Sequence, residues 1–365
     1  MGLYIGLMSG TSVDSVDIAL CDITDQDIHL IEAHSFCIPK HLQDSIHALS
    51  QSNYSIDAID LLGQVDQQIG TLMAQAVIEL LTTHNLTAKD IVAIGSHGQT
   101  IRHRPNDASP FTIQIGDPNC IAGLTGITTV ADFRRKDIAL GGQGAPLVPA
   151  FHKAIFAHPV TTRIIVNLGG IANITVIDGI KPVIGYDTGP ANTLIDQWIK
   201  KHHNVPFDDN GLWAKQGTIN NHLLQQLSTD DYFSLPYPKS TGREYFNLAW
   251  LEKYLSEHHS PVDVQRTLVE LTASTVTQAI LQHSSQGEVF VCGGGAHNSF
   301  LLERLSTMLP DCTIKSTVAL GVEPDWVEAM AFAWLAKQTL SGMNGSLKSV
   351  TGASRDAVLG AIYPP

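Results

Sequence analysis

At 365 residues the chain is long for a single hydrophobic core, so two domains are expected. Hydrophobic residues make up 44% of the chain and charged residues 16%, proportions that are typical of a globular protein and exclude a disordered one. The formal net charge of -13 argues against a nucleic-acid binder, because such a protein needs a basic surface to neutralise phosphates.

The cysteines and the N-terminal segment bear on where the protein works. Its 5 cysteines are scattered and include no C-x-x-C pair, which indicates a reducing compartment. Asp14 and Asp17 interrupt an apolar start that has no basic segment, so no signal peptide is expected. No apolar run approaches the ~20 residues that span a bilayer. We therefore expect a cytoplasmic protein that does not bind a membrane.

The first half of the chain predicts two strands joined by a polar turn, then a long helix and a third strand. The expected elements are a strand at 3–8, a turn at 9–15, a strand at 16–21, a helix at 56–81, and a strand at 91–95 that ends in a polar loop at 96–100. The helix is predicted from apolar residues at helical spacing, such as Val65, Ile69 and Met73.

A change of composition at 114–149 suggests a domain boundary. This region is rich in glycine, aspartate and arginine, and the run GGQG at 141–144 is typical of a flexible or hinge loop. We expect an N-terminal domain at 1–135 and a C-terminal domain at 136–344, with a tail at 345–365 that packs back on the first.

The second half opens in the same way as the first, with two strands on either side of a glycine turn. The expected elements are strands at 163–168 and 171–177, a loop with prolines and aromatic residues at 228–245, a helix at 262–283, a strand at 288–292, and helices at 299–308 and 327–340. Strands that alternate with helices predict an α/β fold.

Three glycine turns, each after a predicted strand, are candidates for binding phosphate. They contain Gly10, then Gly169 and Gly170, and then Gly293, Gly294 and Gly295. Glycine lets backbone N–H groups approach an anion closely, because it has no Cβ and takes a positive φ readily. Any single turn is also compatible with an ordinary hairpin or loop. The chain has neither a P-loop nor a G-x-G-x-x-G motif after its first strand, which favours hairpin turns that grip a triphosphate, with the third turn against adenosine.

The first turn also carries side chains that suit a nucleotide and its metal ion. Thr11 and Ser12 offer hydroxyl donors, and Asp14 and Asp17 offer carboxylates that bind Mg²⁺ directly or through water. Asp14 is the expected metal ligand.

Two acidic residues are candidates for the chemistry. Asp187 follows an apolar stretch and precedes a turn, a position that suits a general base. An Asx-turn or a helix-cap aspartate would look the same. Glu328 begins the last long helix, where a glutamate is commonly a partner of the helix dipole.

Five polar residues that are expected in loops are candidates for binding the substrate: His97, Gln99, Asp132, Arg134 and Arg135. Such groups suit a hydroxylated molecule that bears a carboxylate. The alternative is a network of salt bridges on the surface.

Eight segments resemble the signature segments of the anhydro-N-acetylmuramic acid kinases. They are MSGTSVD at 8–14, GSHGQT at 95–100, VADFR at 130–134, GGQGAPLVP at 141–149, NLGGIAN at 167–173, GYDTGP at 185–190, CGGGAHN at 292–298 and VTGA at 350–353. The resemblance runs from residue 2 to the C-terminus.

This resemblance implies a fold, an activity and a set of site residues. The implied fold is the actin-like ATPase fold, an α/β fold with two RNase H-like domains around an ATP cleft. The implied activity is ATP-dependent opening of the 1,6-anhydro ring of anhydro-N-acetylmuramic acid to give the 6-phosphate, a step of peptidoglycan recycling. Asp187 matches the catalytic base, Glu328 matches an acidic residue near the sugar, and His97 and Arg134 fall in segments that line the sugar pocket.

The residues implied to bind the nucleotide form the longest set. They are Gly10, Thr11, Ser12, Val13, Asp14, Ser15, Val16 and Asp17 in the first turn, Gly169, Gly170 and Asn173 in the second, and Gly293, Gly294, Gly295 and Asn298 in the third. ATP and Mg²⁺ are the implied cofactors.

The chain departs from the family at two positions, and rival functions stay open. Ser15 stands where glycine is common, and Ala191 stands where glycine is frequent. The rivals are a kinase for another sugar on the same fold, and an actin- or Hsp70-like module that uses ATP to control binding. The sequence leaves the oligomeric state open between a monomer and a homodimer.

Overall fold

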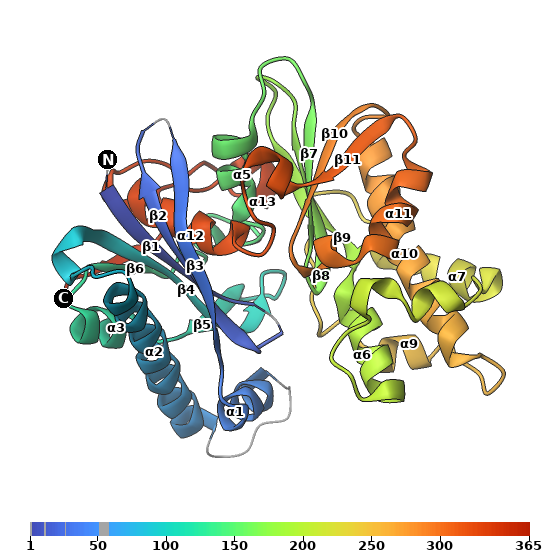
Figure 1. The fold of residues 1–365 in the computed structure, drawn as a ribbon, viewed down its shortest axis with the longest axis horizontal. Coiled ribbons are helices and arrows are strands. Elements are labelled where there is room, and N and C mark those ends of the chain that lie inside the picture. Colours follow the sequence, from blue (N-terminus) through green and yellow to red (C-terminus); the bar gives the residue numbers. More distant parts are fainter. Residues whose placement is uncertain (1, 11, 26, 51–57) are drawn as a thin grey trace. The chain divides into compact units, whose positions relative to one another are not determined.

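The computed structural model describes residues 2–10, 12–25, 27–50 and 58–365, and these form two compact units (Figure 1). Unit 1 comprises Met1–Phe151 and Trp326–Pro365, and unit 2 comprises His152–Asp325. Thr11 and the first residues of the helix expected from 56 lie outside the described residues.

Unit 1 consists of a mixed sheet with helices on both faces. Its strands are β1 (Gly2–Ser9), β2 (Ser15–Ile23), β3 (Ile28–Cys37), β4 (Ile91–Arg104), β5 (Phe111–Ile115), β6 (Thr129–Ala131) and β12 (Ala361–Tyr363). Its helices are α1 (Lys40–Ser50), α2 (Ala58–Thr83), α3 (Pro118–Thr125), α4 (Arg135–Ala139), α12 (Val327–Leu340) and α13 (Lys348–Thr351), and α5 (Val148–Phe156) contains the passage into unit 2.

Unit 2 is built on a second sheet. Its strands are β7 (Arg163–Leu168), β8 (Ile171–Ile177), β9 (Ile184–Pro190), β10 (Gly287–Cys292) and β11 (Cys312–Ser316). Its helices are α6 (Asn192–His203), α7 (Asn221–Ser228), α8 (Asp231–Ser234), α9 (Leu248–Glu252), α10 (Pro261–Leu281) and α11 (Ser299–Met308).

The two sheets share one strand order and one set of strand directions. In unit 1 the strand order is β3-β2-β1-β4-β6. Strand β2 is antiparallel to both β3 and β1, and β4 and β6 run parallel to β1. In unit 2 the order β9-β8-β7-β10-β11 repeats this pattern strand for strand. Three antiparallel strands followed by two parallel strands are the RNase H-like arrangement, so the expected fold class is confirmed.

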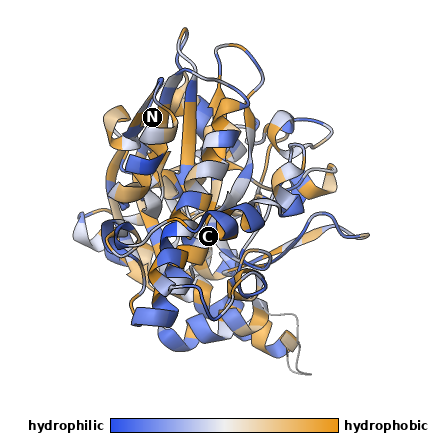
Figure 2. Cartoon of the chain, turned by 90° about the vertical axis from the view of Figure 1, so that its right-hand side faces the viewer, coloured by the Kyte–Doolittle hydropathy of each residue, from blue (hydrophilic) through white to orange (hydrophobic). Residues whose placement is uncertain are grey.

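Each unit encloses an apolar core. In unit 1, α2 presents Val65, Ile69 and Met73 to the core at a spacing of four residues, as predicted. In unit 2, α10 and α6 pack on β7–β10. Colouring by hydropathy shows the apolar strands and the mixed faces of the helices (Figure 2). Within the part of the chain that the structure describes, no helix is long and apolar enough to cross a membrane.

The last long helix, α12, belongs to unit 1 although the segment directly before it, His152–Asp325, forms unit 2. It packs on β1 and β4 because Gly6 and Gly95 have no side chain. A Cβ on Gly6 would lie 1.8 Å from the Ala329 carbonyl oxygen, and one on Gly95 would lie 1.9 Å from that of Phe332. The expected division at 135 and 344 therefore differs from the structural one at 151 and 325.

Three of the candidate residues lie within strands, at positions where a loop or a strand end was expected. The predicted loop at 96–100 is part of β4, which continues to Arg104 because it pairs with β5. His97 and Gln99 are therefore strand residues. Asp187 lies in the middle of β9 and not at its end, since 188–190 continue the strand.

Candidate active site

The first turn, between β1 and β2, is held by hydrogen bonds among its own residues. Val13 is left-handed (φ 60°) and its N–H donates to the Gly10 carbonyl over 3.3 Å. The Asp14 carboxylate accepts from the Ser12 hydroxyl and from the Ser15 N–H, the latter over 3.0 Å. A Cβ on Gly10 would meet only the Ser12 hydroxyl, at 3.9 Å, so the space beside Gly10 is open.

The two departures from the family have a structural explanation. Ser15 is the first residue of β2, and the left-handed residue of the described turn is Val13 instead. Ser15 also donates to Asp17 over 3.2 Å and accepts from the Ser9 hydroxyl over 3.1 Å. Ala191 has a φ of −117°. Neither position requires glycine.

Glu328 lies in the first turn of α12, close to the charges of Asp17 and Arg134. Its side chain is half-buried. Burial raises the pKa of Glu328, the Arg134 guanidinium lowers it, and the Asp17 carboxylate raises it further. The fold thus brings the carboxylate of Asp17, near the start of β2, close to the glutamate and the arginine that were expected beside the sugar.

Arg134 is joined to His97 by a hydrogen bond that also defines the state of the histidine. Arg134 Nε donates to His97 Nε2 over 2.9 Å, so Nδ1 carries the imidazole proton and donates it to the Gly98 carbonyl over 2.9 Å. Burial and the Arg134 charge hold the pKa of His97 well below its usual value. His97 is therefore neutral. It is also almost fully buried, with 5% of its surface exposed.

Gln99 connects β4 to the first turn. Its Oε1 accepts from the Ser9 hydroxyl over 2.6 Å, and its Nε2 donates to the Thr100 carbonyl over 3.0 Å. With 1% of its surface exposed, Gln99 supports the turn.

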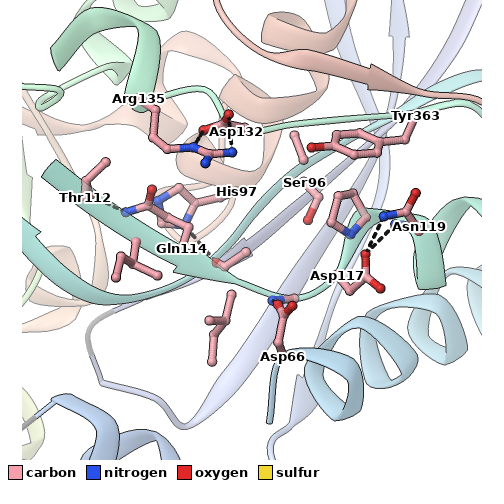
Figure 3. A pocket seen from close by; sticks show the side chains of 16 residues that line it. Asp66, Ser96, His97, Thr112, Gln114, Asp117, Asn119, Asp132, Arg135 and Tyr363 are labelled. Atoms are coloured by element: carbon pink, nitrogen blue, oxygen red, sulfur yellow. Dashed lines mark hydrogen bonds and ion pairs between the residues drawn. The ribbon is translucent and has the colours of Figure 1, made fainter. Parts of the chain in front are cut away.

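A polar pocket of about 320 Å³ lies in unit 1 beside β4, β5 and the end of β6 (Figure 3). Three of the five expected substrate-binding residues line it, namely His97, Asp132 and Arg135, whereas Gln99 and Arg134 do not. Arg135 forms a bidentate ion pair with Asp132, with both N–O distances at 2.6 Å. The alternative interpretation of these residues was a network of surface salt bridges. This pair fits that alternative, because the Arg135 side chain is 65% exposed.

The opposite side of the pocket is acidic. Asp66 accepts from the Gly116 N–H over 2.6 Å, and Asp117 accepts from the Asn119 N–H over 2.8 Å at the start of α3. Burial raises the pKa of Asp66, and the charge of Asp117 adds to this effect. Carboxylates accept hydrogen bonds, so this side suits the hydroxyl or amide donors of a ligand. Tyr363 adds a phenol from the tail (Figure 3).

In unit 2, Asp187 is held by a loop that begins after α8. Its carboxylate accepts from the Thr241 N–H over 2.9 Å, and its side chain is 9% exposed. Its own N–H donates to the Lys239 carbonyl over 3.2 Å, and its carbonyl accepts from the Tyr232 hydroxyl over 2.7 Å. Both the backbone and the carboxylate of Asp187 are therefore fixed by residues 232–241.

Lys239 places a cation near Asp187. Its Nζ donates to the Tyr232 and Phe233 carbonyls over 3.1 and 3.2 Å. Burial lowers the pKa of Lys239, and the charge of Asp187 opposes this shift. Asn173 of β8 is paired directly with Asp187 of β9, so both side chains lie on the same face of the sheet.

The glycines of the second and third turns fall into two kinds. A Cβ on Gly169 or Gly294 would meet nothing within 3.5 Å, its nearest neighbours lying at 3.6 and 3.9 Å. A Cβ on Gly293 (φ 76°) would lie 2.3 Å from Asn167 Oδ1, and one on Gly295 would also clash with β7. Gly293 and Gly295 are thus required by packing, whereas Gly169 and Gly294 leave open space.

Two more of the expected nucleotide residues support the start of a helix. The Gly170 carbonyl accepts from the Ala191 and Thr193 N–H groups at the start of α6, each over 3.0 Å. Asn298 caps α11, since its Oδ1 accepts from the Leu301 N–H over 3.0 Å.

Comparison with known proteins decides the family. A family described as anhydro-N-acetylmuramic acid kinase matches residues 2–365. A protein of that name from Shewanella baltica (strain OS155) is 53% identical over 363 residues, which cover 99% of this chain and 98% of the relative. One from Shewanella sediminis is 51% identical over 364 residues, with the same coverage. The chain belongs to the anhydro-N-acetylmuramic acid kinase family.

Several solved structures resemble this member of the anhydro-N-acetylmuramic acid kinase family more distantly. The activator of the 2-hydroxyisocaproyl-CoA dehydratase from Clostridium difficile with bound ADPNP is 12% identical, with a TM-score of 0.45 over 93% of this chain and 97% of that one. A ROK family glucokinase from Streptomyces griseus in complex with glucose and AMPPNP is 13% identical, with a TM-score of 0.42 over 92% of this chain and 100% of that one.

Membership of the anhydro-N-acetylmuramic acid kinase family confirms the expectation of a sugar kinase and does not favour the rival functions. Sequence reasoning missed the residues that position Asp187, namely Tyr232, Lys239 and Thr241. The signal was the polar run within the loop at 228–245, which was noted only for its prolines and aromatic residues. It also missed the acidic side of the pocket, formed by Asp66 and Asp117.

Proposed function

We propose that this sugar kinase uses ATP and water to convert anhydro-N-acetylmuramic acid to N-acetylmuramic acid 6-phosphate, a step of peptidoglycan recycling, with Asp187 as the base. The observation that carries the proposal is the geometry of Asp187. Its carboxylate is almost buried, is aimed by the Thr241 N–H and lies near the Lys239 ammonium. A fixed carboxylate in such a place suits proton abstraction better than a helix cap does.

The bond changes follow from the substrate. Water loses a proton to the Asp187 carboxylate while its oxygen forms a bond to C1, as in an inverting glycosidase. The C1–O6 bond breaks, and O6 forms a bond to the γ-phosphorus of ATP as the bond from that phosphorus to ADP breaks. The departing O6 needs no proton, because the phosphoryl group captures it. The protein then supplies mainly alignment and charge stabilisation.

The nucleotide phosphates are assigned to the glycine turns. Gly10 and Gly169 support this assignment, because the space beside each Cα is open, so backbone N–H groups are accessible to an anion. Gly294 offers the same opening in the third turn, which is assigned to the adenosine. Val16 lies in β2 with its side chain in the apolar core of unit 1, so it supports the turn from below and offers the phosphates no side-chain contact.

Mg²⁺ is assigned to the carboxylates of the first turn. Among the described residues no group of three or more His, Cys, Asp or Glu side chains could hold a metal ion. This fits Mg²⁺ in a kinase, which is commonly held by one or two carboxylates together with phosphate oxygens and water. Asp14 and Asp17 are the candidates, and Asp17 is favoured by its proximity to Glu328. The ion neutralises charge on the phosphates when it is bound.

The sugar is assigned to unit 1 around His97, Arg134 and Glu328, with the adjoining pocket for its substituents. Arg134 or Arg135 pairs with the lactyl carboxylate, and this contact distinguishes muramic acid from plain anhydro sugars. The acidic side of the pocket supplies acceptors for hydroxyl and amide donors. Because the reaction consumes ATP, we also assign the protein to the cytoplasm.

The test is the fate of oxygen from water. The purified protein is incubated with ATP, Mg²⁺ and anhydro-N-acetylmuramic acid in ¹⁸O-water, and the product is analysed at once by mass spectrometry. We expect one ¹⁸O atom at C1 and none in the phosphate ester. Product without ¹⁸O at C1 would overturn the proposal, as would turnover of a reducing sugar with no turnover of the anhydro sugar.

A further inference from the structure

Two motifs of the sequence, GGQG at 141–144 and VTGA at 350–353, meet at one buried carboxylate that the proposed mechanism does not use. Asp137 of α4 is 0% exposed. Its Oδ1 accepts from the Thr351 hydroxyl over 2.8 Å, and its Oδ2 accepts from the Gly144 N–H over 2.8 Å. Each carboxylate oxygen of Asp137 therefore accepts a hydrogen bond from one of the two motifs.

The backbone reinforces this junction. The Gly142 N–H donates to the Asp137 carbonyl over 2.9 Å, and the Gln143 N–H donates to the Thr351 carbonyl over 2.8 Å. A Cβ on Gly142 would lie 2.3 Å from Asp137 Oδ2, and Gly144 has a φ of 67°. The glycines let the loop wrap closely around the carboxylate, so the segment whose composition is typical of a flexible or hinge loop is held here by hydrogen bonds.

The same loop holds Arg134. Its Nη1 donates to the Gly144 carbonyl over 2.8 Å while its Nε donates to His97. Gly144 is thus hydrogen-bonded to Asp137 through its N–H and to Arg134 through its carbonyl. A shift of Gly144 would move the guanidinium, because that carbonyl is one of its anchors.

We propose that Asp137 is a positioning residue for sugar binding, which holds Arg134 in place through Gly144 and is itself oriented by Thr351 from the C-terminal segment. The inference rests on the proposed role of Arg134 in binding the sugar. The Arg134 charge also reaches Asp137 and partly offsets the effect of burial on its pKa. Asp137 touches no substrate in this scheme, so it acts only through the arginine.

The experiment compares the Michaelis constants of the full-length variants Asp137→Asn and Thr351→Val. Asparagine is uncharged and retains one acceptor oxygen, so both hydrogen bonds lose their charge assistance and only one of the two donors still meets an oxygen of residue 137. We expect the KM for the sugar to rise about tenfold or more in Asp137→Asn, the scale of one lost hydrogen bond to a charged group. We expect a smaller rise in Thr351→Val, recovery in Thr351→Ser, and a KM for ATP and a kcat that stay within about threefold.

Controls separate positioning from stability. Thr125→Val removes a buried threonine hydroxyl of the same unit, which donates to the Ile121 carbonyl over 2.7 Å at the end of α3. It should lower the melting temperature without changing the KM for the sugar. In an Arg134→Gln background, Asp137→Asn should add little, because the two residues act as one unit.

Three outcomes overturn the inference. One is an unchanged KM for the sugar in folded Asp137→Asn and Thr351→Val. Another is a rise in the KM for both the sugar and ATP together with a fall in kcat, which would indicate a structural role. The third is full additivity of Asp137→Asn with Arg134→Gln. If Arg134→Gln itself leaves the KM for the sugar unchanged, the proposed role of Arg134 fails first. If Asp137→Asn does not fold, the pair Thr351→Val and Thr351→Ser decides.

Discussion

Asp187 is held at three points by helix α8 and the loop that follows it in unit 2. The Thr241 N–H aims the carboxylate, while Tyr232 and Lys239 fix the backbone. A base must be held within hydrogen-bond reach of the proton it removes, and a mobile carboxylate would lose much of its effect.

Replacing Asp187 with asparagine tests this role. The substitution keeps the size and the hydrogen bond from Thr241 but removes the basic oxygen. We expect Asp187→Asn to lower kcat by roughly two to four orders of magnitude, the usual scale for a general base, with nearly intact binding of ATP and sugar. Stopped assays and calorimetry measure the two effects. Asp178→Asn, at an aspartate paired with Lys181, is the control, and turnover near wild type in Asp187→Asn would remove this residue from the mechanism.

Glu328 gives a prediction about pH. Because burial raises its pKa, this carboxyl takes up a proton at a higher pH than an ordinary glutamate does. If its charged form binds the sugar, kcat/KM for the sugar falls as the pH falls through this raised pKa. We expect Glu328→Gln to have a lower kcat/KM and an acid limb shifted to lower pH, because the carboxyl group with the raised pKa is gone.

The pH profile is measured from about pH 4 to pH 8 on both proteins. The exposed glutamate Glu323 provides a control variant, Glu323→Gln, whose profile should match that of the wild type. An acid limb at the same pH in Glu328→Gln and in the wild type would mean that Glu328 does not titrate during catalysis.

At the scale of elements, the glycine turns separate into those that serve packing and those that leave space. Gly293 needs its left-handed φ and has no room for a Cβ, whereas Gly10 has room. The sequence shows both as glycine after a strand. The difference arises because β10 ends against Asn167 of β7, whereas a Cβ on Gly10 would approach only the Ser12 hydroxyl, at 3.9 Å, among the described residues.

A pair of variants tests this difference. We expect Gly10→Val to fold normally but to bind an ATP analogue about tenfold or more weakly, because its side chain fills the space beside the backbone donors. Gly293→Ala should instead lower stability by about 1–3 kcal/mol through strain at the positive φ. Calorimetry and chemical unfolding separate the two effects. Unchanged affinity in a folded Gly10→Val protein would contradict the phosphate assignment.

At the scale of the whole molecule, each unit contributes one part of the proposed chemistry. The base Asp187 lies in unit 2, whereas Glu328, Arg134 and the polar pocket lie in unit 1. The nucleotide turns are also divided, with the first in unit 1 and the other two in unit 2. On the proposed assignment, neither unit alone holds the full set of residues.

Hydrogen exchange with mass spectrometry tests this division of labour. We expect a non-hydrolysable ATP analogue to slow exchange at 9–17 in unit 1 and at 168–171 and 293–298 in unit 2. Adding the anhydro sugar should extend protection to 95–100 and 130–135. Protection confined to one unit with the nucleotide bound would contradict the assignment of its phosphates to turns of both units.

The sequence by itself determined the local elements and the family. Helices at 299–308 and 327–340 and the strand pairs around the first and second glycine turns were predicted correctly, because their signals repeat every few residues. The long motifs then predicted the kinase family and the candidate base.

Only the tertiary structure decided which distant segments meet. It placed α12 in unit 1 through Gly6 and Gly95, and it extended β4 past His97 through pairing with β5. It also joined Thr351 to Asp137 across 214 residues. Local periodicity carries no information about such contacts, because close packing and strand pairing depend on which surfaces meet after the chain has folded.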